Sequence, residues 1–395
     1  MNIFDKWRNI FPSSVIKVIP MPPPYTKMLA INSDVEWTSW DSQIDLFHYF
    51  ADRNIEVAFS FWLYGNPAVT WRLFNDDGSK TKEFDRAVKL MKAGMLDTNH
   101  SIGGRRHQGG CEFNRKTIIR AYQVLNDLNI HPKVYTNHGS IDDKQNVAGE
   151  WAAYQEGDLP SSDFYHLDIT RDLGAVFFWC DPDYIIDRPY LLPELNKDNG
   201  LFLTALGRDG TPYLRFRRYM GGGLKGGPSL DNFHLQLDSL LNSDENGYSV
   251  VFQHLGVFRE KSGRPAKADT RKMPIEVIEA FDALASAQNE GNVLITTTEK
   301  LLLHAALMTA QPWEIKNKPA CIEVKFKSQF KLDAVIFSVT KKTLSGWCIE
   351  DIGKKVEAYI GEQPVVLIKF TSKDKKYIGL PWRKINMNET LDEIS

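Results

Sequence analysis

Short apolar runs alternate with amphipathic helical segments along most of this chain, beginning near Lys27. Runs such as 28–31 have the length and composition of buried strands, whereas 39–53 repeats its apolar residues every three or four positions, as an amphipathic helix does. By the same criteria, we expect strands over 28–31, 56–63, 133–135, 175–180, 248–254 and 293–297, and helices over 39–53, 84–92, 114–129, 231–242, 275–289 and 298–308. Because parallel strands need crossover connections, which are usually helices, this alternation predicts an α/β fold with a parallel sheet or barrel.

Three segments depart from this alternation. Residues 1–26 end in PMPPP, which excludes a helix or a central strand, so we expect an extended lead-in there. Residues 202–216 are typical of a β-hairpin, with its turn at 208–210, inserted between two β/α repeats. From 312 the runs become β-branched and partly alternating, which predicts a small antiparallel β domain over 312–395 after a β/α domain over 27–311.

The composition is that of a globular protein. Of the 395 residues, 43% are hydrophobic and 25% are charged, and the formal net charge is −2. No chain-wide positive field would gather a phosphate backbone, so we do not expect nucleic acid as a partner. The four cysteines form no CxxC pair, which argues against a disulfide framework and against a cysteine-rich zinc module.

The sequence also lacks the signals of export and of membrane insertion. Residues 1–11 mix charged and apolar side chains, unlike the uninterrupted apolar core of a secretory signal. The longest uncharged stretch, 57–71, has 15 residues and includes glycine and proline, whereas a membrane-spanning helix needs about 20 apolar residues. We therefore expect no membrane span and a cytoplasmic location. The sequence does not indicate an oligomeric state.

Side chains that can bind a metal follow several of the predicted strands. The carboxyl ends of parallel strands meet on one rim of such a fold, where ligands and substrates usually bind. A mixed set of carboxylates and imidazoles suits Zn²⁺ or a similar divalent ion with an open position for water. The candidates are Asp34, Glu36, His100, His107, His138 and His254.

Several of these residues have structural alternatives. Asp34 stands at a strand-to-helix junction, where an aspartate often caps the helix. His107 lies among arginines and glycines and is equally suited to a loop that contacts an acidic sugar. His138 is open to three roles: a third metal ligand, a donor that orients a ligand, or a hydrogen-bonded core histidine.

The order of these motifs over 27–308 resembles that of the NodB-like polysaccharide deacetylases, in a divergent form. Residues 30–34 (AINSD) resemble the first family motif, with Asp34 on the metal position, and His100-Ser101, followed by His107, resembles the second. Residues 136–139 (TNHG) and 179–184 (WCDPDY) stand at the third and fourth motifs. Residues 251–255 (VFQHL) resemble the fifth, whose histidine acts as a general acid.

Two departures from the family pattern bear on activity. Ser33 stands where the family has its catalytic-base aspartate, and a neutral hydroxyl cannot accept a proton as a carboxylate does. Residues 136–139 supply neither the arginine nor the tyrosine of the third motif. Glu36 is the nearest carboxylate that can replace the missing base.

The resemblance implies a distorted β/α barrel and a divalent ion, zinc above all. Asp34 and His100 would hold the ion with His107 or His138, while backbone amides near His138 would serve the oxyanion. His254 would protonate the leaving group. The expected carbohydrate contacts are Trp37, Trp40, Asn137, Asp181 and Arg217.

Two functional hypotheses follow. In the first, the protein is a metal-dependent hydrolase that removes an acyl group, such as acetyl, from an amino sugar or a polysaccharide precursor. In the second, it is a catalytically silent barrel that binds a glycan or a protein partner, which the missing aspartate and arginine favour. The sequence leaves open which sugar is bound and whether the bond is an amide or an ester.

Overall fold

The computed structural model describes residues 16–65, 70–103, 114–138, 143–147, 155–180, 185–221, 228–259, 265–267, 269–317, 321–327, 335–339, 355–360, 362–365, 368–372, 375–380 and 382–394. These residues belong to two compact units. One unit combines 27–301 with 384–395, and the other combines 1–26 with 302–383. The chain therefore leaves the larger unit and returns to it at its C-terminal end.

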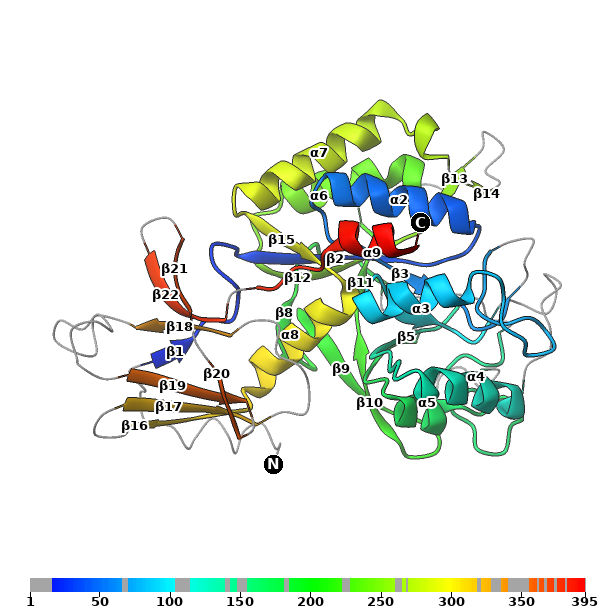
Figure 1. Ribbon diagram of the computed structural model, residues 1–395, viewed down its shortest axis with the longest axis horizontal. Helices are drawn as coiled ribbons and strands as arrows, with labels where there is room; N and C mark the ends of the chain where they lie inside the picture. The colour runs from blue at the N-terminus through cyan, green and yellow to red at the C-terminus, as the bar shows by residue number, and fades with distance from the viewer. Residues whose placement is uncertain are drawn as a thin grey trace. The chain divides into compact units, whose positions relative to one another are not determined.

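A large, mostly parallel sheet of twelve described strands forms the α/β unit (Figure 1). In spatial order the strands are β7 (Ile185–Ile186), β11 (Arg218–Tyr219), β12 (Gly247–Gln253), β2 (Lys27–Ser33), β3 (Ala58–Phe61), β4 (Leu96–His100), β5 (Val134–Thr136), β6 (Phe177–Trp179), β10 (Pro212–Phe216), β9 (Gly200–Leu206) and β8 (Leu192–Leu195). Strand β15 (Val293–Thr296) pairs with the first half of β2. An isolated bridge joins Leu191, just before β8, to Tyr248 in β12.

Helices lie between or directly after several of these strands, and all but one of them were predicted from the sequence. In chain order they are α2 (Trp40–Asp52), α3 (Phe84–Ala93), α4 (Arg115–Asp127), α5 (Leu167–Leu173), α6 (Phe233–Leu241), α7 (Ile275–Asn289) and α8 (Thr298–Ala310). Local signals set their ends: Ser39 and Asn114 cap α2 and α4 through their side chains, and Gly94 ends α3 with a φ of 82°. None of the described helices has the length and apolar composition that crossing a membrane requires.

The two faces of the sheet differ in chemistry because strand side chains alternate in direction. On one face, apolar residues such as Ile31, Phe61 and Phe178 join the hydrophobic core. On the other, polar side chains occupy the carboxyl ends of the strands, among them Asn32 and Thr136, both fully buried. This polar layer is where the candidate site is built.

The predicted hairpin is confirmed: β9 and β10 pair antiparallel on either side of residues 207–211. Strand β10 also pairs with β6, so the hairpin continues the main sheet instead of standing apart as an insertion. Two helices were not predicted. Helix α5 connects β5 to β6, and α9 (Met387–Ile394) lies near the end of the chain.

The smaller unit contains two four-stranded sheets. The first orders β1 (Ile16–Val18), β18 (Val335–Val339), β22 (Lys375–Leu380) and β21 (Ile368–Ser372), and the second orders β16 (Trp313–Asn317), β17 (Cys321–Phe326), β19 (Lys355–Ile360) and β20 (Gln363–Val365). All pairs are antiparallel except β17 with β19, which is parallel.

The unit boundaries differ from the expected ones at both ends of the chain. The lead-in contributes β1, an edge strand of the smaller unit, so residues 1–26 are not a separate segment. Residues 384–395 belong to the α/β unit, because α9 packs against α2 and α3 through its buried apolar side chains. The β-rich part thus ends near 383, short of the expected 395.

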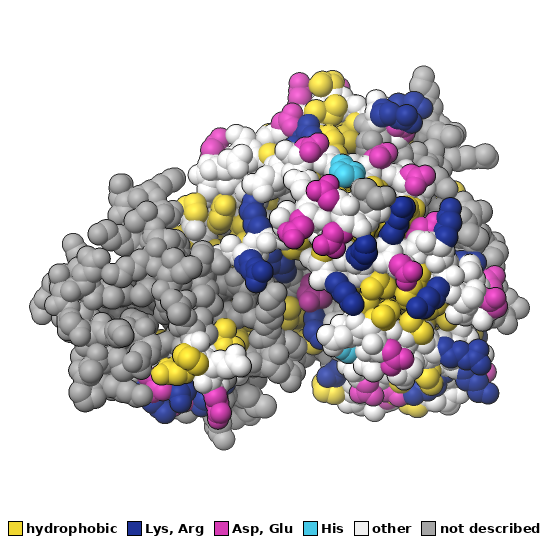
Figure 2. Space-filling model, viewed as in Figure 1, with side chains coloured by type: hydrophobic (Ala, Val, Ile, Leu, Met, Phe, Trp, Pro, Cys, Tyr) yellow, Lys and Arg dark blue, Asp and Glu magenta, His cyan; other side chains and the backbone are white. Residues whose placement is uncertain are grey.

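Acidic and basic side chains are interspersed over the described part of the face shown in Figure 2. This mixture accords with the balance of 48 basic against 50 acidic residues. The view gives no indication of a surface that would attract a polyanion through charge alone.

Buried His166 should make folding pH-dependent. Burial lowers its pKa from 6.5 to about 4 and outweighs the hydrogen bond to Gln145 O at 2.6 Å, which raises it; the other ring nitrogen lies 2.8 Å from Thr170 Oγ1. In the unfolded chain, this imidazole takes up a proton near pH 6.5. The stability that the neutral ring contributes to the folded state is therefore complete above that pH and is lost as the pH falls toward 4. Between pH 7 and 5, wild type should lose about 2 kcal/mol more unfolding free energy than His166→Gln in urea titrations. Equal losses would contradict the assignment.

Candidate metal centre

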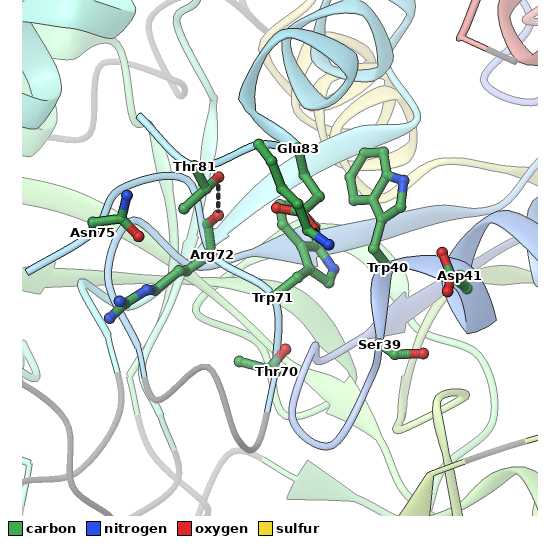
Figure 3. A pocket seen from close by; sticks show the side chains of 10 residues that line it. Ser39, Trp40, Asp41, Thr70, Trp71, Arg72, Asn75, Thr81 and Glu83 are labelled. Atoms are coloured by element: carbon green, nitrogen blue, oxygen red, sulfur yellow. Dashed lines mark hydrogen bonds and ion pairs between the residues drawn. The ribbon is translucent and has the colours of Figure 1, made fainter. Parts of the chain in front are cut away.

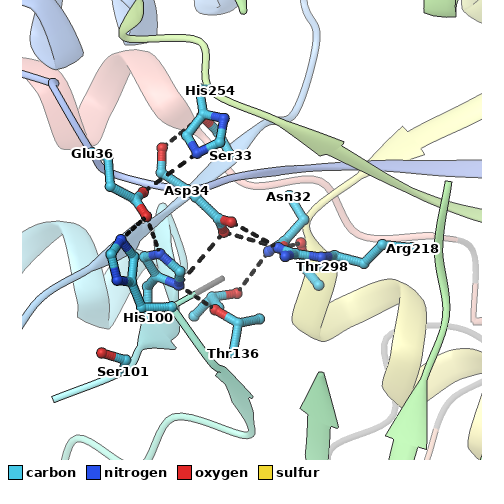
Figure 4. Close-up of polar contacts among 12 residues, drawn as sticks. Asn32, Ser33, Asp34, Glu36, His100, Ser101, Thr136, Arg218, His254 and Thr298 are labelled. Carbon is cyan, nitrogen blue, oxygen red and sulfur yellow. Dashed lines mark hydrogen bonds and ion pairs between the residues drawn. The ribbon is translucent and has the colours of Figure 1, made fainter. Parts of the chain in front are cut away.

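Five chemically active side chains meet at the carboxyl ends of the parallel strands. Figure 4 labels four of them: Asp34, Glu36, His100 and His254. Asp34 and Glu36 follow β2, His100 is the last residue of β4, His138 comes shortly after β5, and His254 directly follows β12. The alternation of strands and helices had placed these strand ends on one rim, and the structure brings the side chains together there.

Glu36 is the centre of the cluster. Its Oε1 lies 2.8 Å from His100 Nε2 and 3.0 Å from His138 Nε2. One possible ligand atom from each of the three residues lies within 4.8 Å of the others, and all three side chains are buried. Two imidazoles and one carboxylate form a donor set known from catalytic zinc sites and non-haem iron sites.

Each imidazole is oriented by a partner on its far side. His100 Nδ1 lies 2.8 Å from Thr136 Oγ1, and His138 Nδ1 contacts the Asp143 carboxylate. Trp62, just after β3, packs near both rings, at centroid distances of 6.1 and 5.4 Å. Metal-binding histidines are typically held in this way, because the outer contact fixes the ring and directs its other nitrogen at the ion.

The electrostatics of the cluster also suit a cation. Burial raises the pKa of the Glu36 carboxyl, but the charges and hydrogen bonds of His100 and His138 outweigh it and hold the pKa well below its usual range. Burial lowers the pKa of His138, while hydrogen bonds to Asp143 and Glu36 raise it to about 9. Glu36 Oε2 is buried without a hydrogen-bond partner among the described residues. The donors therefore fit a divalent cation, which would replace the His138 proton.

Asp34 is placed differently from the expected metal ligand. Arg218 Nη1 lies 2.9 and 3.1 Å from its two oxygens and 2.7 Å from Asn32 Oδ1. The guanidinium is fully buried and stacks against Trp179 and Phe252, with its carbon 3.6 and 4.1 Å from the ring centroids. A buried arginine needs a paired carboxylate, and Asp34 supplies it. Asp34 still forms a second possible ligand set with Glu36 and His254.

Ser33 and His254 define the opposite side of the cluster. Ser33 Oγ accepts a hydrogen bond from Leu255 N at 3.0 Å and so joins the end of β2 to the loop after β12. His254 Nε2 lies 3.6 Å from Glu36 Oε2, while its Nδ1 lies 3.2 Å from Pro228 O. Burial lowers the pKa of His254, with a partial offset from Glu36 and Asp34. The ring is therefore neutral near pH 7 and can accept a proton.

No protein-family model, no curated protein and no solved structure matches this chain. Its function is therefore inferred from the arrangement of side chains at the strand ends.

The expected substrate contacts lie in several places. Trp37 is half-buried and has a left-handed φ of 60°, directly after Glu36. Trp40 is buried and lines a separate pocket. The Asn137 amide is engaged by the backbone of Val147 and Cys180, so it holds the loop together and does not face a substrate.

Arg217 points away from the cluster. Its Nη1 donates to the carbonyls of Lys197, Asp198 and Gly200, in the turn between β8 and β9. The next residue, Arg218, begins β11 and is the one that reaches the site, where it contacts Asp34 and Asn32. His107 and Asp181 lie outside the described residues.

Removing the outer partner of one histidine should weaken metal binding. In Asp143→Asn, the carboxylate that orients His138 is lost, and we expect Zn²⁺ affinity to fall about 10- to 100-fold. Competition with a chromophoric chelator measures the change. Asp97→Asn is the matched control, since Asp97 is also buried but contacts Thr98 and the backbone of Glu299. An unchanged affinity in Asp143→Asn would remove Asp143 from the site.

Proposed function

We propose that this protein is a metal-dependent hydrolase that removes an acyl group, such as acetyl, from an amino sugar or a polysaccharide precursor. The observation that carries the proposal is Glu36 lying between His100 Nε2 and His138 Nε2, with both rings oriented from behind. The likeness of the strand-end motifs to NodB-like deacetylases supports this reaction class and a barrel-like sheet.

Glu36, His100 and His138 would hold the ion, for which zinc is our first candidate because two histidines and a glutamate form a known catalytic zinc site. When bound, such an ion supplies polarisation of the acyl oxygen and lowers the pKa of a bound water. Trp62 and the ends of the strands are buried, so they limit the access of bulk solvent to the cluster from the side of the sheet.

His254 is proposed to move the proton. Its Nδ1–H donates to the Pro228 carbonyl, which leaves the lone pair of Nε2 on the side of Glu36. A neutral imidazole there can accept a proton from the attacking water and then donate it to the departing nitrogen or oxygen. The carboxylate of Glu36 would stabilise the imidazolium between these two steps.

This assignment also accounts for the missing base. Ser33 is buried and already accepts the Leu255 amide, so position 33 offers no proton acceptor. Glu36, expected from the sequence as the replacement base, is occupied by two imidazoles. The imidazoles engage Glu36 through Oε1, and Glu36 Oε2 would serve the ion, so we assign the proton to Nε2 of His254.

Metal content and acetate release test the proposal. Protein incubated with Zn²⁺ and dialysed should hold about one equivalent of zinc, and it should release acetate from a panel of N- and O-acetylated amino sugars. If the protein holds no stoichiometric metal, the hydrolase proposal fails. If it holds metal but deacylates nothing, the catalytically silent barrel that binds a glycan or a protein becomes the better hypothesis. Ser33, at the position of the aspartate in the NodB-like motif, already favours that hypothesis.

A further inference from the structure

A pocket of about 400 Å³ lies beside the start of α2, bordered by residues 39–41 and parts of 70–83 (Figure 3). Its volume is within the range of small-molecule binding sites. It is separate from the metal centre, and neither the family likeness nor the metal chemistry assigns it a role.

Two tryptophans form its apolar wall. The rings of Trp40 and Trp71 meet edge to face, with centroids 5.2 Å apart and an interplanar angle of 86°. Trp71 Nε1 donates to the Gln43 side chain, which fixes the orientation of that ring. Rigid indoles of this kind offer apolar contact with little entropy cost, and the C–H face of a sugar ring is a common partner for them.

The rest of the pocket is polar and balanced in charge. Asp41 and Glu83 supply two carboxylates, and Arg72 and Lys82 supply two cations. Arg72 is further engaged by the Asp76 carboxylate and by Gly65 O. Both cations of the lining are thus paired with carboxylates, Arg72 with Asp76 and Lys82 with Glu83 at 3.5 Å, which weakens attraction for an anion, whereas the lining still provides donors and acceptors for hydroxyl groups. The lining therefore fits an uncharged, hydroxyl-rich ligand.

The pocket wall is joined to the segment that carries Glu36. Thr70 Oγ1 donates to Val35 O at 2.6 Å, and Trp71 N donates to Thr38 O at 3.4 Å. Between these contacts, Trp37 holds a left-handed backbone conformation, which persists only where the surroundings enforce it. A ligand in the pocket would thus rest on the same turn that positions Glu36.

We propose that this pocket binds one uncharged sugar unit, adjacent to the unit that carries the acyl group. The adjacency rests on the proposed function, whereas the binding of a sugar rests on the pocket alone. The pocket would then select oligosaccharides over single amino sugars.

Binding can be tested without catalysis. Full-length protein in EDTA is titrated with N-acetylglucosamine, N-acetylgalactosamine and their β-linked disaccharides, followed by calorimetry and saturation-transfer NMR. Wild type should bind at least one disaccharide, and Asp41→Asn should weaken that binding about tenfold, since a hydrogen bond to a charged acceptor is lost. Asp45→Asn is the matched control, because Asp45 is an exposed aspartate of α2 outside the pocket lining, and its affinity should stay within about twofold.

The outcomes separate this inference from the proposed function. If no sugar binds, or if both variants bind like wild type, the pocket proposal is overturned, whatever the metal content. If the disaccharide binds as expected but the protein holds no zinc and releases no acetate, the hydrolase fails and the sugar pocket stands. Circular dichroism of both variants excludes unfolding as the cause of a loss.

Discussion

Replacing Glu36 by alanine is expected to remove bound zinc and acyl hydrolysis together. Glu36 is the carboxylate that touches both imidazoles of the cluster, at 2.8 and 3.0 Å. Loss of an outer partner alone costs about 10- to 100-fold in metal affinity, so loss of this ligand should cost more than about 100-fold. Zinc content after dialysis should fall from about one equivalent to near zero, and acetate release should fall with it.

Asp34→Asn is the informative comparison, because the motif likeness places Asp34 on the metal position, whereas we propose Glu36, His100 and His138 as the ligands. Asp34 is paired with Arg218, so its amide variant should still hold zinc. The variant should lose stability, since an unpaired buried arginine costs about 3–5 kcal/mol, and thermal unfolding checks this separately. Zinc lost from Asp34→Asn and kept by Glu36→Ala would show that the motif position is the ligand after all.

The architecture of the α/β unit was largely readable from the sequence because its periodicities are strong. The expected helix over 275–289 coincides with α7, and Asn114, the first residue of the expected helix over 114–129, is the N-cap of α4. The return of residues 384–395 to the α/β unit was not predicted from the sequence. Helix α9 has only eight residues, yet Met387, Leu391 and Ile394 follow a helical spacing and are buried, so the signal was present but short.

The candidate site was harder to read, for a physical reason. The strand ends pointed to His100, His138 and His254, which the structure brings together, but which carboxylate they contact depends on what else is buried nearby. Arg218 lies 184 positions from Asp34, and no local pattern reports such a pairing. The break between β10 and β11 at residue 217 also gave no local signal that Arg218, and not Arg217, contacts the site.

The pairing of Asp34 with Arg218 also changes how the missing base is understood. One carboxylate is paired with a guanidinium and the other is held by two imidazoles, which is why the proposed mechanism gives proton transfer to His254. Under that proposal, serine at position 33 does not by itself imply a silent fold. The base function would then lie on the histidine whose counterpart in the NodB-like motif acts as an acid.

Replacing His254 by alanine should therefore separate chemistry from metal binding. The imidazole is 3.6 Å from Glu36 Oε2 but lies outside the set formed by Glu36, His100 and His138. We expect the variant to keep about one equivalent of zinc and to lose about 100- to 10,000-fold in acetate release, the usual contribution of a general acid–base group. His48→Ala, at an exposed position of α2, should change neither quantity.

The combination of the two measurements decides the role of His254. If zinc content and activity both fall, His254 is a metal ligand, in line with its place beside Asp34 and Glu36 in the second possible ligand set. If neither changes, the proton must move through another group and the proposed mechanism is wrong. A proton-transfer role requires a loss of activity at constant zinc content. In that case the ion and its three donors are still in place, but the leaving group has no histidine to protonate it.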